Sequence, residues 1–400
     1  MDKTILHCDC NSFYTSVETV NHPEYACVPM AVCGSVEDRH GIVLAKNELA
    51  KKCNIITGEA VWSAKAKCPS LITVEPNHKT YEQYSILLNK IYEQYTDRVE
   101  PFGIDESWLD VSESRTLFGS GVKIADELRL LIKKEIGITI SVGVSFNKSF
   151  SKLGSDYKKP DATTYIPREH FKEIIFPLPA SDLIFVGKKT GERLKMMGIN
   201  TIGQLAACEV STLVSVFGKF GESIHIAANG NENSVVSLFH ERTKEKSIGN
   251  GMTFKRDLVS KDDAKTALDI ICDEVGTRMR AAKMKSQTIV VGIRDTKLSV
   301  ITKQKQLKSP TFSSKAIEEA AFDILSLNWD FRKPIRSLTV TCNNLIDENL
   351  ACEQLYIYGS NEDEKQKKVD ALEKTIDNLR KKFGADSIFP CSVLNSRDEF

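Results

Sequence analysis

The sequence predicts an α+β protein of several domains, and three observations support that prediction. Residues 1–145 alternate strand-like and helix-like segments in the order β-α-β-β-α-β, which is typical of a ferredoxin-like core. Residues 180–230 show short helical segments separated by glycines, and residues 245–345 return to longer strands and helices. The length of 400 residues exceeds the size at which a single hydrophobic core keeps growing.

An apolar strand over Thr4–Cys8 opens the ferredoxin-like pattern and ends at Asp9. A helix is expected directly after it, because Asn11 and Ser12 are favourable N-cap residues. The other elements expected before residue 160 are a hairpin of Ala31–Cys33 with Gly41–Ala45, helices at Asn47–Lys52, Tyr81–Thr96, Val122–Ile136 and Ser149–Tyr157, and a strand at Ile138–Val144.

The stretch Val99–Val111 is expected to form two strands of a hairpin around Asp105 and Glu106. Adjacent strand residues point to opposite faces of a sheet, so these two carboxylates can serve one site only if the backbone turns between them. Gly103 makes such a turn feasible. We therefore expect an irregular backbone from Gly103 to Glu106.

Three carboxylates, those of Asp9, Asp105 and Glu106, can converge in such a core because the first strand and the hairpin can be neighbours. Two divalent ions about 3.5–4 Å apart need several hard oxygen ligands, and these side chains with a backbone carbonyl can supply them. The helix that begins after Asp9 also offers unpaired N–H groups to a phosphate. Taken alone, the pattern leaves open that these residues are capping and surface acids.

The second half of the chain carries a hidden excess of positive charge. The whole chain has a formal net charge of zero, but residues 240–345 carry 20 basic and 13 acidic residues. Such a block fits a surface that contacts DNA phosphates, and an ordinary solvated lysine-rich face remains the alternative. The glycine-broken helices of residues 180–230 fit helix-hairpin-helix units or a plain helical linker domain. The elements expected after residue 245 are strands at Thr288–Ile293, Leu298–Thr302 and Ser337–Cys342, helices at Ala264–Ala281 and Ser314–Leu327, and a charged helix around Lys365–Lys382.

Location is expected to be cytoplasmic, without a membrane partner. The N-terminus lacks the apolar core of a signal peptide, and no stretch approaches the roughly 18 apolar residues of a membrane span. The eleven cysteines are scattered, and Cys8 and Cys10 lack further ligands for zinc, so reduced packing cysteines are expected.

Four motifs resemble those of the Y-family, lesion-bypass DNA polymerases, and most closely the DinB/UmuC-like bacterial members. They are Asp9-Cys10-Asn11-Ser12-Phe13-Tyr14, Gly103-Ile104-Asp105-Glu106-Ser107, Ser141-Val142-Gly143-Val144-Ser145 with Asn147-Lys148, and Asp156 through Lys159-Pro160. The resemblance implies a right-hand polymerase with a ferredoxin-like palm (1–15 and 79–168), small fingers (16–78), a helix-hairpin-helix thumb (169–236), an α+β little finger that binds DNA (243–346) and a C-terminal tail (347–400).

The resemblance also implies the roles of individual residues. Asp105 and Glu106 would be catalytic, and Tyr14 would be the steric gate, whose ring leaves no room for a 2′-hydroxyl. Two Mg²⁺ ions, or Mn²⁺ in their place, would be held by Asp9, Asp105, Glu106 and the carbonyl of Cys10. The nucleotide would be bound by Asn11, Ser12, Phe13, Tyr14, Lys51 and Lys159.

The fingers depart from the family pattern. Many relatives carry a Tyr and an Arg three residues apart that grip the triphosphate, and Glu48 and Lys51 stand at those positions here. Lysine keeps the charge but lacks the bidentate fork of arginine, and Lys46 could compensate. Ile42 and Leu44, expected over the nascent base pair, are bulkier than the residues of some relatives. A tighter pocket is expected, and replacing both by alanine should widen lesion tolerance.

In the tail, Gln354-Leu355-Tyr356-Ile357-Tyr358 resembles a sliding-clamp-binding pentapeptide, with Gln354, Leu355, Ile357 and Tyr358 as the contacts. A small strand packed on the little finger is the alternative. The expected partners are therefore primer-template DNA, deoxynucleoside triphosphates and a sliding clamp, and the protein is expected to be a monomer.

The function expected from these features is low-fidelity translesion DNA synthesis by two-metal nucleotidyl transfer. Two alternatives are a nucleotide cyclase on a palm fold and a catalytically inactive DNA-binding mutasome scaffold. A cyclase needs no grip on a duplex, and a scaffold needs no intact carboxylates. Primer extension by the wild type and by Asp105→Ala distinguishes the three.

Overall fold

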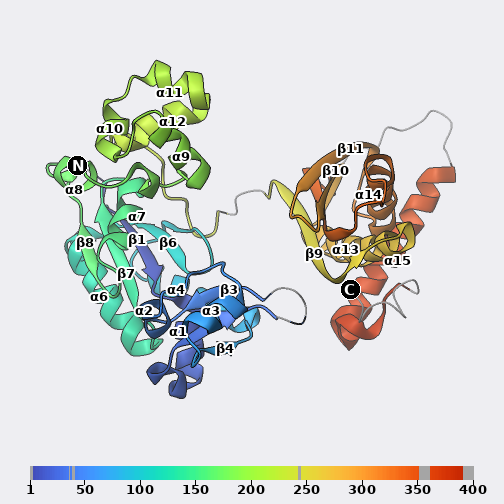
Figure 1. Cartoon of the computed structure of the whole chain (residues 1–400), viewed down its shortest axis with the longest axis horizontal. Helices are drawn as coiled ribbons and strands as arrows, with labels where there is room; N and C mark the ends of the chain where they lie inside the picture. The colour runs from blue at the N-terminus through green and yellow to red at the C-terminus, as the bar shows by residue number, and fades with distance from the viewer. Residues whose placement is uncertain (1–2, 36, 38–40, 242–244, 351–360, 391–400) are drawn as a thin grey trace. The chain divides into compact units, whose positions relative to one another are not determined.

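The computed structural model describes residues 3–35, 37, 41–241, 245–350 and 361–390 (Figure 1). Contacts divide the chain into two compact units. The first comprises Met1–Gly34 with Ile42–Arg242, and the second comprises Ser35–Gly41 with Thr243–Phe400. The boundaries of palm, fingers, thumb and little finger stay predictions.

A five-stranded sheet forms the centre of the first unit, in the order β5-β6-β1-β7-β8. The middle strand β1 (Ile5–Cys10) pairs antiparallel with β6 (Glu106–Asp110) and with β7 (Ile140–Ser145). The edges are β5 (Val99–Pro101) and β8 (Thr163–Tyr165). Strands β5, β6, β1 and β7 have the order of the ferredoxin-like fold that the sequence predicts.

The predicted first strand is too short. Because β6 and β7 pair with β1 as far as Asp9 and Cys10, the strand continues through Asp9 instead of ending before it. Ser12 does precede α1 (Phe13–Asn21), but it has a left-handed backbone (φ 49°) and its side chain makes no capping hydrogen bond. The amide of Asn11 is also engaged, by Thr139, so neither residue caps the helix as expected.

Helices cover both faces of this sheet. Alternation along β1 directs Leu6, Cys8 and Cys10 into a core with α4 (His78–Tyr92) and α6 (Gly121–Glu135). The opposite face is covered by α7, and it carries the side chains of His7 and Asp9. The predicted helices are therefore present, although α4 begins and ends earlier than the expected Tyr81–Thr96.

The helix α7 (Lys148–Tyr157) lies unusually close to the sheet. A Cβ atom on Gly143 of β7 would lie only 1.8 Å from the backbone oxygen of Ser151 and 2.4 Å from the backbone nitrogen of Ser155. A Cβ on Gly154 would in turn lie 3.0 Å from the Cα of Gly143. Two glycines therefore allow backbone to pack on backbone here.

A smaller sheet follows α1 and has the order β3-β2-β4, with helices α2 (Glu48–Lys52) and α3 (Val61–Lys67) around it. The antiparallel pairing of β2 (Met30–Cys33) with β3 (Val43–Lys46) confirms the expected hairpin. The parallel strand β4 (Ile72–Val74) was not expected. These elements have their own core, and they lie in the segment that is expected to form the fingers.

Short helices follow after residue 170, as the glycine pattern predicts. They are α8 (Phe171–Ile175), α9 (Lys188–Met196), α10 (Ile202–Ala207), α11 (Val210–Phe217) and α12 (Lys219–Ala228). Their core includes Phe146, Phe150 and Leu153, which connects these helices to α7.

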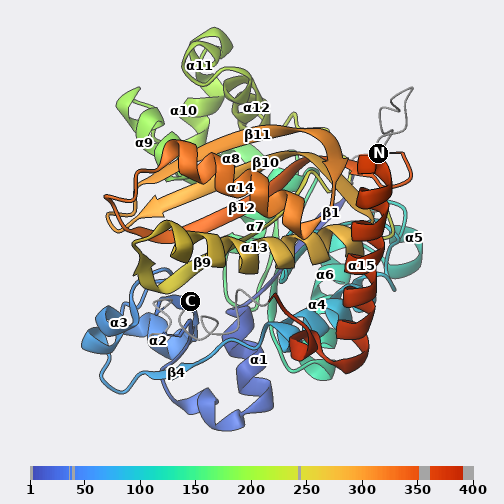
Figure 2. The ribbon, with the colours of Figure 1, turned by 90° about the vertical axis from the view of Figure 1, so that its right-hand side faces the viewer.

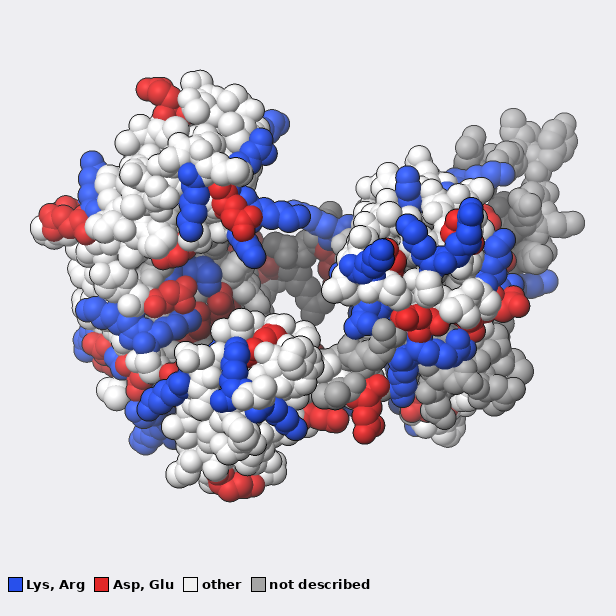
Figure 3. All heavy atoms as spheres, in the orientation of Figure 1, with Lys and Arg blue, Asp and Glu red and all other residues white. Residues whose placement is uncertain are grey.

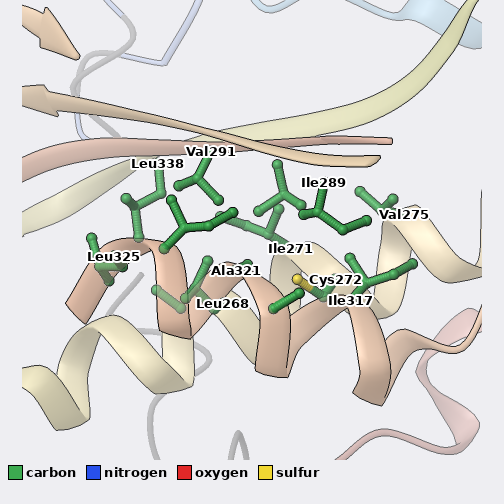
Figure 4. Packing of buried hydrophobic residues seen from close by; sticks show 14 of the residues in the cluster. Leu268, Ile271, Cys272, Val275, Ile289, Val291, Ile317, Ala321, Leu325 and Leu338 are labelled. Atoms are coloured by element: carbon green, nitrogen blue, oxygen red, sulfur yellow. The ribbon is translucent and has the colours of Figure 1, made fainter. Parts of the chain in front are cut away.

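The second unit is a four-stranded antiparallel sheet with two long helices on one face. The strand order is β11-β10-β12-β9, and α13 (Lys261–Ala281) and α14 (Ser314–Asn328) bury one continuous apolar core against it (Figure 4). The sequence predicts three of these strands, but it misses β9. The strands are β9 (Ser247–Leu258), β10 (Met284–Asp295), β11 (Val300–Thr311) and β12 (Ile335–Asp347).

The charged helix expected in the tail is α15 (Asn361–Phe383), which crosses the end of α13 (Figure 2). A buried ion-pair network joins the two helices. The guanidinium of Arg280 donates to Glu373 at 2.8 Å and to both carboxylate oxygens of Asp377, at 2.5 and 3.0 Å. Only 4% of the Arg280 side chain is exposed. Among the described residues, no helix is long and apolar enough to cross a membrane.

Candidate active site

The β1–β6 ladder brings the predicted carboxylates together. Asp9 lies directly opposite Glu106, so their side chains point to the same face of the sheet. Asp105 precedes β6, and its carbonyl accepts a hydrogen bond from the Cys10 N–H at 3.1 Å. The backbone bends from Gly103 to Asp105, with φ +130° at Gly103, as the sequence analysis requires.

A cavity of about 520 Å³ opens beside these residues, between β1, β6 and the fingers. Glu48, Leu44 and Lys46 contribute to its wall from the fingers. The cavity thus brings together nine of the predicted metal and nucleotide ligands: Asp9, Cys10, Asn11, Ser12, Phe13, Lys51, Asp105, Glu106 and Lys159.

Tyr14 does not line this cavity, but it lies nearby. Its ring stacks on that of Tyr81, with centroids 4.2 Å apart and planes 14° apart, and meets the His78 ring edge-on. Burial raises the pKa of the Tyr14 hydroxyl, and the charge of Asp105 raises it further. The stacked partner fixes the direction of the Tyr14 ring.

Lysines neutralise the carboxylates in this structure. The Lys159 amine lies 2.6 Å from Asp9 and 2.7 Å from Asp156, and the Lys152 amine lies 2.5 Å from Glu106. The sequence analysis missed Lys152, which α7 aims at Glu106. Its spacing of four residues from Lys148 could have indicated a shared helix face, but not what that face contacts.

His7 is the second residue that the sequence analysis missed. Its ring is fully buried, its Nδ1 lies 2.8 Å from the Ser155 hydroxyl, and its Nε2 lies 3.5 Å from Glu106. Burial lowers the pKa of the imidazole. His7 stands two residues before Asp9 in β1, so both side chains lie on the same face of the sheet. This spacing is the sequence signal that could have identified His7.

The pKa values of the three carboxylates are shifted in opposite directions. Burial raises the pKa of Asp9 to about 7 despite the charge of Lys159, and burial with the nearby Glu106 also raises the pKa of Asp105. Burial alone would raise the pKa of Glu106, but hydrogen bonds from His7 and Lys152 outweigh it and lower that pKa to about 2. The site therefore concentrates negative charge that cations must compensate.

The carboxylate oxygens of the site fit divalent cations, although they do not surround a common metal position in this structure. Among the described residues, no three His, Cys, Asp or Glu side chains surround one metal position. The carboxylates of Asp9 and Glu106 form ion pairs with lysine amines instead. Buried carboxylate oxygens are the ligands that Mg²⁺ and Mn²⁺ prefer, and mobile lysine amines can move away when a metal binds.

The amide groups around the start of α1 are only partly available. The backbone N–H of Asn11 donates to Thr139 at 2.9 Å, and its side chain bonds Thr139 and Ser141. The backbone N–H of Asn11 is therefore not free to bind a phosphate, contrary to expectation. The first turn of α1, with Phe13 and Tyr14, retains the unpaired N–H groups that every helix start has.

The fingers-side ligands are paired with each other. The Lys51 amine lies 2.5 Å from Glu48, and both side chains are about half exposed. The interaction of Lys51 with a nucleotide therefore requires this weak pair to open. The proposed clamp contacts Gln354, Leu355, Ile357 and Tyr358 lie outside the described residues.

Comparison with known proteins places the chain in a family. Residues 8–156 match the impB/mucB/samB family, and residues 245–356 match the C-terminal domain of that family. A DNA polymerase IV from Acetivibrio thermocellus is 45% identical over 397 residues, which cover 99% of each chain. This chain belongs to the Y-family of DNA polymerases.

The polymerase has further relatives of full length. DNA polymerase IV 1 from Bacillus subtilis is 32% identical over 398 residues, covering 99% of this chain and 94% of the relative. Among solved structures, a chimeric Y-family DNA polymerase has a TM-score of 0.77 at 23% identity, covering 86% of this chain and 99% of its own. A ternary complex of the polymerase Dbh has a TM-score of 0.60 with the same coverage and identity.

These likenesses confirm the predicted family, the right-hand fold and the enzyme class. The chain is a DNA-directed DNA polymerase of the lesion-bypass type, with DNA and nucleotides as substrates. Its family consists of metal-dependent nucleotidyltransferases. Neither the nucleotide cyclase nor the inactive scaffold is favoured.

Proposed function

We propose that this polymerase copies damaged DNA with two Mg²⁺ ions held by Asp9, Asp105, Glu106 and the carbonyl of Cys10. The observation that carries the proposal is the register of β1 and β6. Asp9 and Glu106 are direct partners in the ladder, and the Cys10–Asp105 hydrogen bond holds the third carboxylate beside them. When bound, the ions would activate the primer 3′-hydroxyl and stabilise the leaving pyrophosphate.

The remaining residues of the cavity would bind and orient the nucleotide. The Lys159 amine, released from Asp9, would contact the triphosphate, and the N–H groups at the start of α1 would receive its oxygens. Tyr14 would lie beneath the sugar as the steric gate. Its stack on Tyr81 supports this role, because the ring cannot turn aside to admit a 2′-hydroxyl.

Primer extension with Mg²⁺ tests this assignment. Asp105→Ala should lose about a hundred- to thousandfold in activity, the effect of removing one essential electrostatic group. Glu113→Ala, which removes an exposed carboxylate elsewhere in the same unit, is the matched control and should extend normally. Wild-type activity in Asp105→Ala would refute the assignment.

The same assay with ribonucleotides tests the steric gate. Tyr14→Ala should incorporate ribonucleotides at least about tenfold better relative to deoxyribonucleotides, because the ring that excludes the extra oxygen is gone. Unchanged selectivity would show that another residue excludes the 2′-hydroxyl.

We further propose that the polymerase works in the cytoplasm as a monomer and binds a sliding clamp through Gln354, Leu355, Ile357 and Tyr358. A short apolar-aromatic peptide in a polar tail suits a hydrophobic groove. A peptide of residues 350–360 should bind the cognate clamp in a fluorescence anisotropy titration, and its Leu355→Ala, Tyr358→Ala version should not. Equal behaviour of the two peptides would contradict the proposal.

A further inference from the structure

A tryptophan on the fingers is almost fully exposed. Trp62 of α3 keeps 79% of its surface accessible, whereas Val61, Ala64 and Cys68 of the same segment are buried in the core of the fingers. Because these buried residues recur every three or four positions, the opposite face of α3 is turned outward. Trp62 and Lys65 lie one turn apart on that exposed face.

This face lies close to the cavity of the candidate active site. Ile42 forms a β-bridge with Ala60, two residues before Trp62, and the chain runs from Ile42 through β3 to Leu44 in the cavity wall. Bridged residues lie about 5 Å apart, and two further residues span about 7 Å at most. Trp62 therefore lies within about 12 Å of the strand that borders the cavity.

The surroundings of Trp62 favour a nucleic acid. Residues 42–71 contain five lysines and two glutamates, and Lys or Arg side chains lie over α3 in Figure 3. Lys67 pairs with Glu59, but Lys65 has no ion-pair partner among the residues that the structure describes. The apolar residues Ile42 and Ile56 lie nearby, and they expose 45% and 59% of their surface. An aromatic ring beside a free cation matches the sites that bind single strands, in which bases stack on rings and phosphates meet amines.

We propose that the outward face of α3 binds the single-stranded template ahead of the nascent base pair, with a base stacked on Trp62 and a phosphate at Lys65. The inference rests on the proposed function, because a template passes the fingers only if synthesis occurs in the adjoining cavity. The excess of positive charge favours this occupant over a protein partner or a second copy of the chain.

Tryptophan fluorescence tests the proposal on the full chain. The protein has three tryptophans, of which Trp108 is buried. In a Trp329→Phe background, Trp62 is the exposed tryptophan, so a change in fluorescence reports on this face of α3. Two primer-templates with the same duplex are compared, one blunt and one with a six-nucleotide 5′ template overhang. The overhang should quench the emission of Trp62. It should also lower Kd at least about fivefold, measured for every variant by the fluorescence anisotropy of a labelled primer, and Trp62→Ala should abolish that fivefold gain.

Two variants sharpen the result. Lys65→Gln should reduce the slope of log Kd against log salt by about 0.7 for the overhang substrate, the value for one phosphate contact on a single strand. Leu117→Ala removes a side chain that is 82% exposed in α5 (Arg115–Phe118), away from the cavity wall, and should keep the full overhang gain.

The proposal is overturned if wild-type protein binds both substrates equally, or if the overhang gain survives in Trp62→Ala. Binding is measured without nucleotide or metal. A failure of the proposed catalytic function would therefore appear in primer extension alone, and a failure of the template site would appear in these titrations alone.

Discussion

In the cavity of the first unit, each ion-paired carboxylate meets a lysine through a single nitrogen, whereas in the second unit Arg280 holds two carboxylates through three nitrogens. Both places bury charge. A lysine amine on a flexible stem is readily exchanged for another cation, but a guanidinium fork fixes geometry. The lysine pairs therefore suit ligand exchange, and the arginine network suits permanent attachment of α15.

The largest effect is expected in the second unit. Arg280→Ala should lower the free energy of unfolding by about 3 kcal/mol, because the largely buried Glu373 and Asp377 then lose their cationic partner and keep only hydrogen bonds from hydroxyl and backbone groups. Urea unfolding measures the loss, and hydrogen exchange of α15 locates it. Arg278→Ala is the matched control two residues away, since its exposed pair with Glu274 contributes less than about 0.5 kcal/mol. Equal losses in the two variants would contradict the comparison.

A substitution in the cavity is expected to have a smaller effect, and it should raise the free energy of unfolding. The folded state raises the pKa of Asp9 to about 7, so it binds the proton more tightly than the unfolded chain does, and stability falls as pH rises from about 4 to 7. Without metal at pH 8, Asp9→Asn should therefore be about 1–3 kcal/mol more stable than the wild type. Thermal unfolding in a chelator measures this difference.

Metal addition separates this effect from general stabilisation. Mg²⁺ at ten times its Kd should stabilise the wild type by about 1.4 kcal/mol and Asp9→Asn by much less, because the variant has lost a ligand. An equal shift of Tm in both proteins would show that the ion binds elsewhere.

Lys159→Gln should raise the KM for deoxynucleotides about tenfold, because one charge-assisted contact to the triphosphate is lost. Steady-state extension kinetics measure it. Lys133→Gln is the control, since Lys133 pairs with Asp161 and does not line the cavity. A change in kcat alone, with KM unaltered, would argue against a role in nucleotide binding.

The smallest effect is expected at Asp161, a partly exposed carboxylate. Burial alone would raise its pKa, but hydrogen bonds from Lys133 and Arg129 outweigh it and lower the pKa below 3.8. The stabilisation is present above that value and is lost as pH falls through the lower folded pKa. Asp161→Asn should remove a pH-dependent contribution below about 1 kcal/mol. Titrating Tm against pH between 5 and about 2 checks this.

Local patterns were sufficient to predict much of the fold. The order of strands in the palm, the hairpin β2–β3 and the helices α6 and α7 follow from apolar spacing, N-caps and glycines. The strands β4, β8 and β9 were missed because β4 and β8 have three residues each and β9 alternates weakly, so their pairing depends on distant strands. Such non-local pairing is invisible in a short window of sequence.

The site was predicted only in part for the same reason. Asp9, Asp105 and Glu106 carry local motif signals, and the bend at Gly103 follows from two adjacent carboxylates serving one site. The contacts of Lys152 and His7 depend on how α7 packs against the sheet, which no local spacing encodes. The engaged N–H of Asn11 likewise depends on Thr139, which lies far away in the sequence.

Gly143 has no side chain and does not contact the carboxylates of the site. Its contact with α7 nevertheless affects the position of the lysines that pair with them. The depth at which α7 lies sets the reach of Lys152 and, just beyond the helix, of Lys159. A methyl group at position 143 would overlap the backbone of α7, so Gly143→Ala should displace this helix and the two amines with it. The tolerance of the site to mutation is thus set partly at position 143, where the lack of a Cβ allows α7 to lie against the sheet.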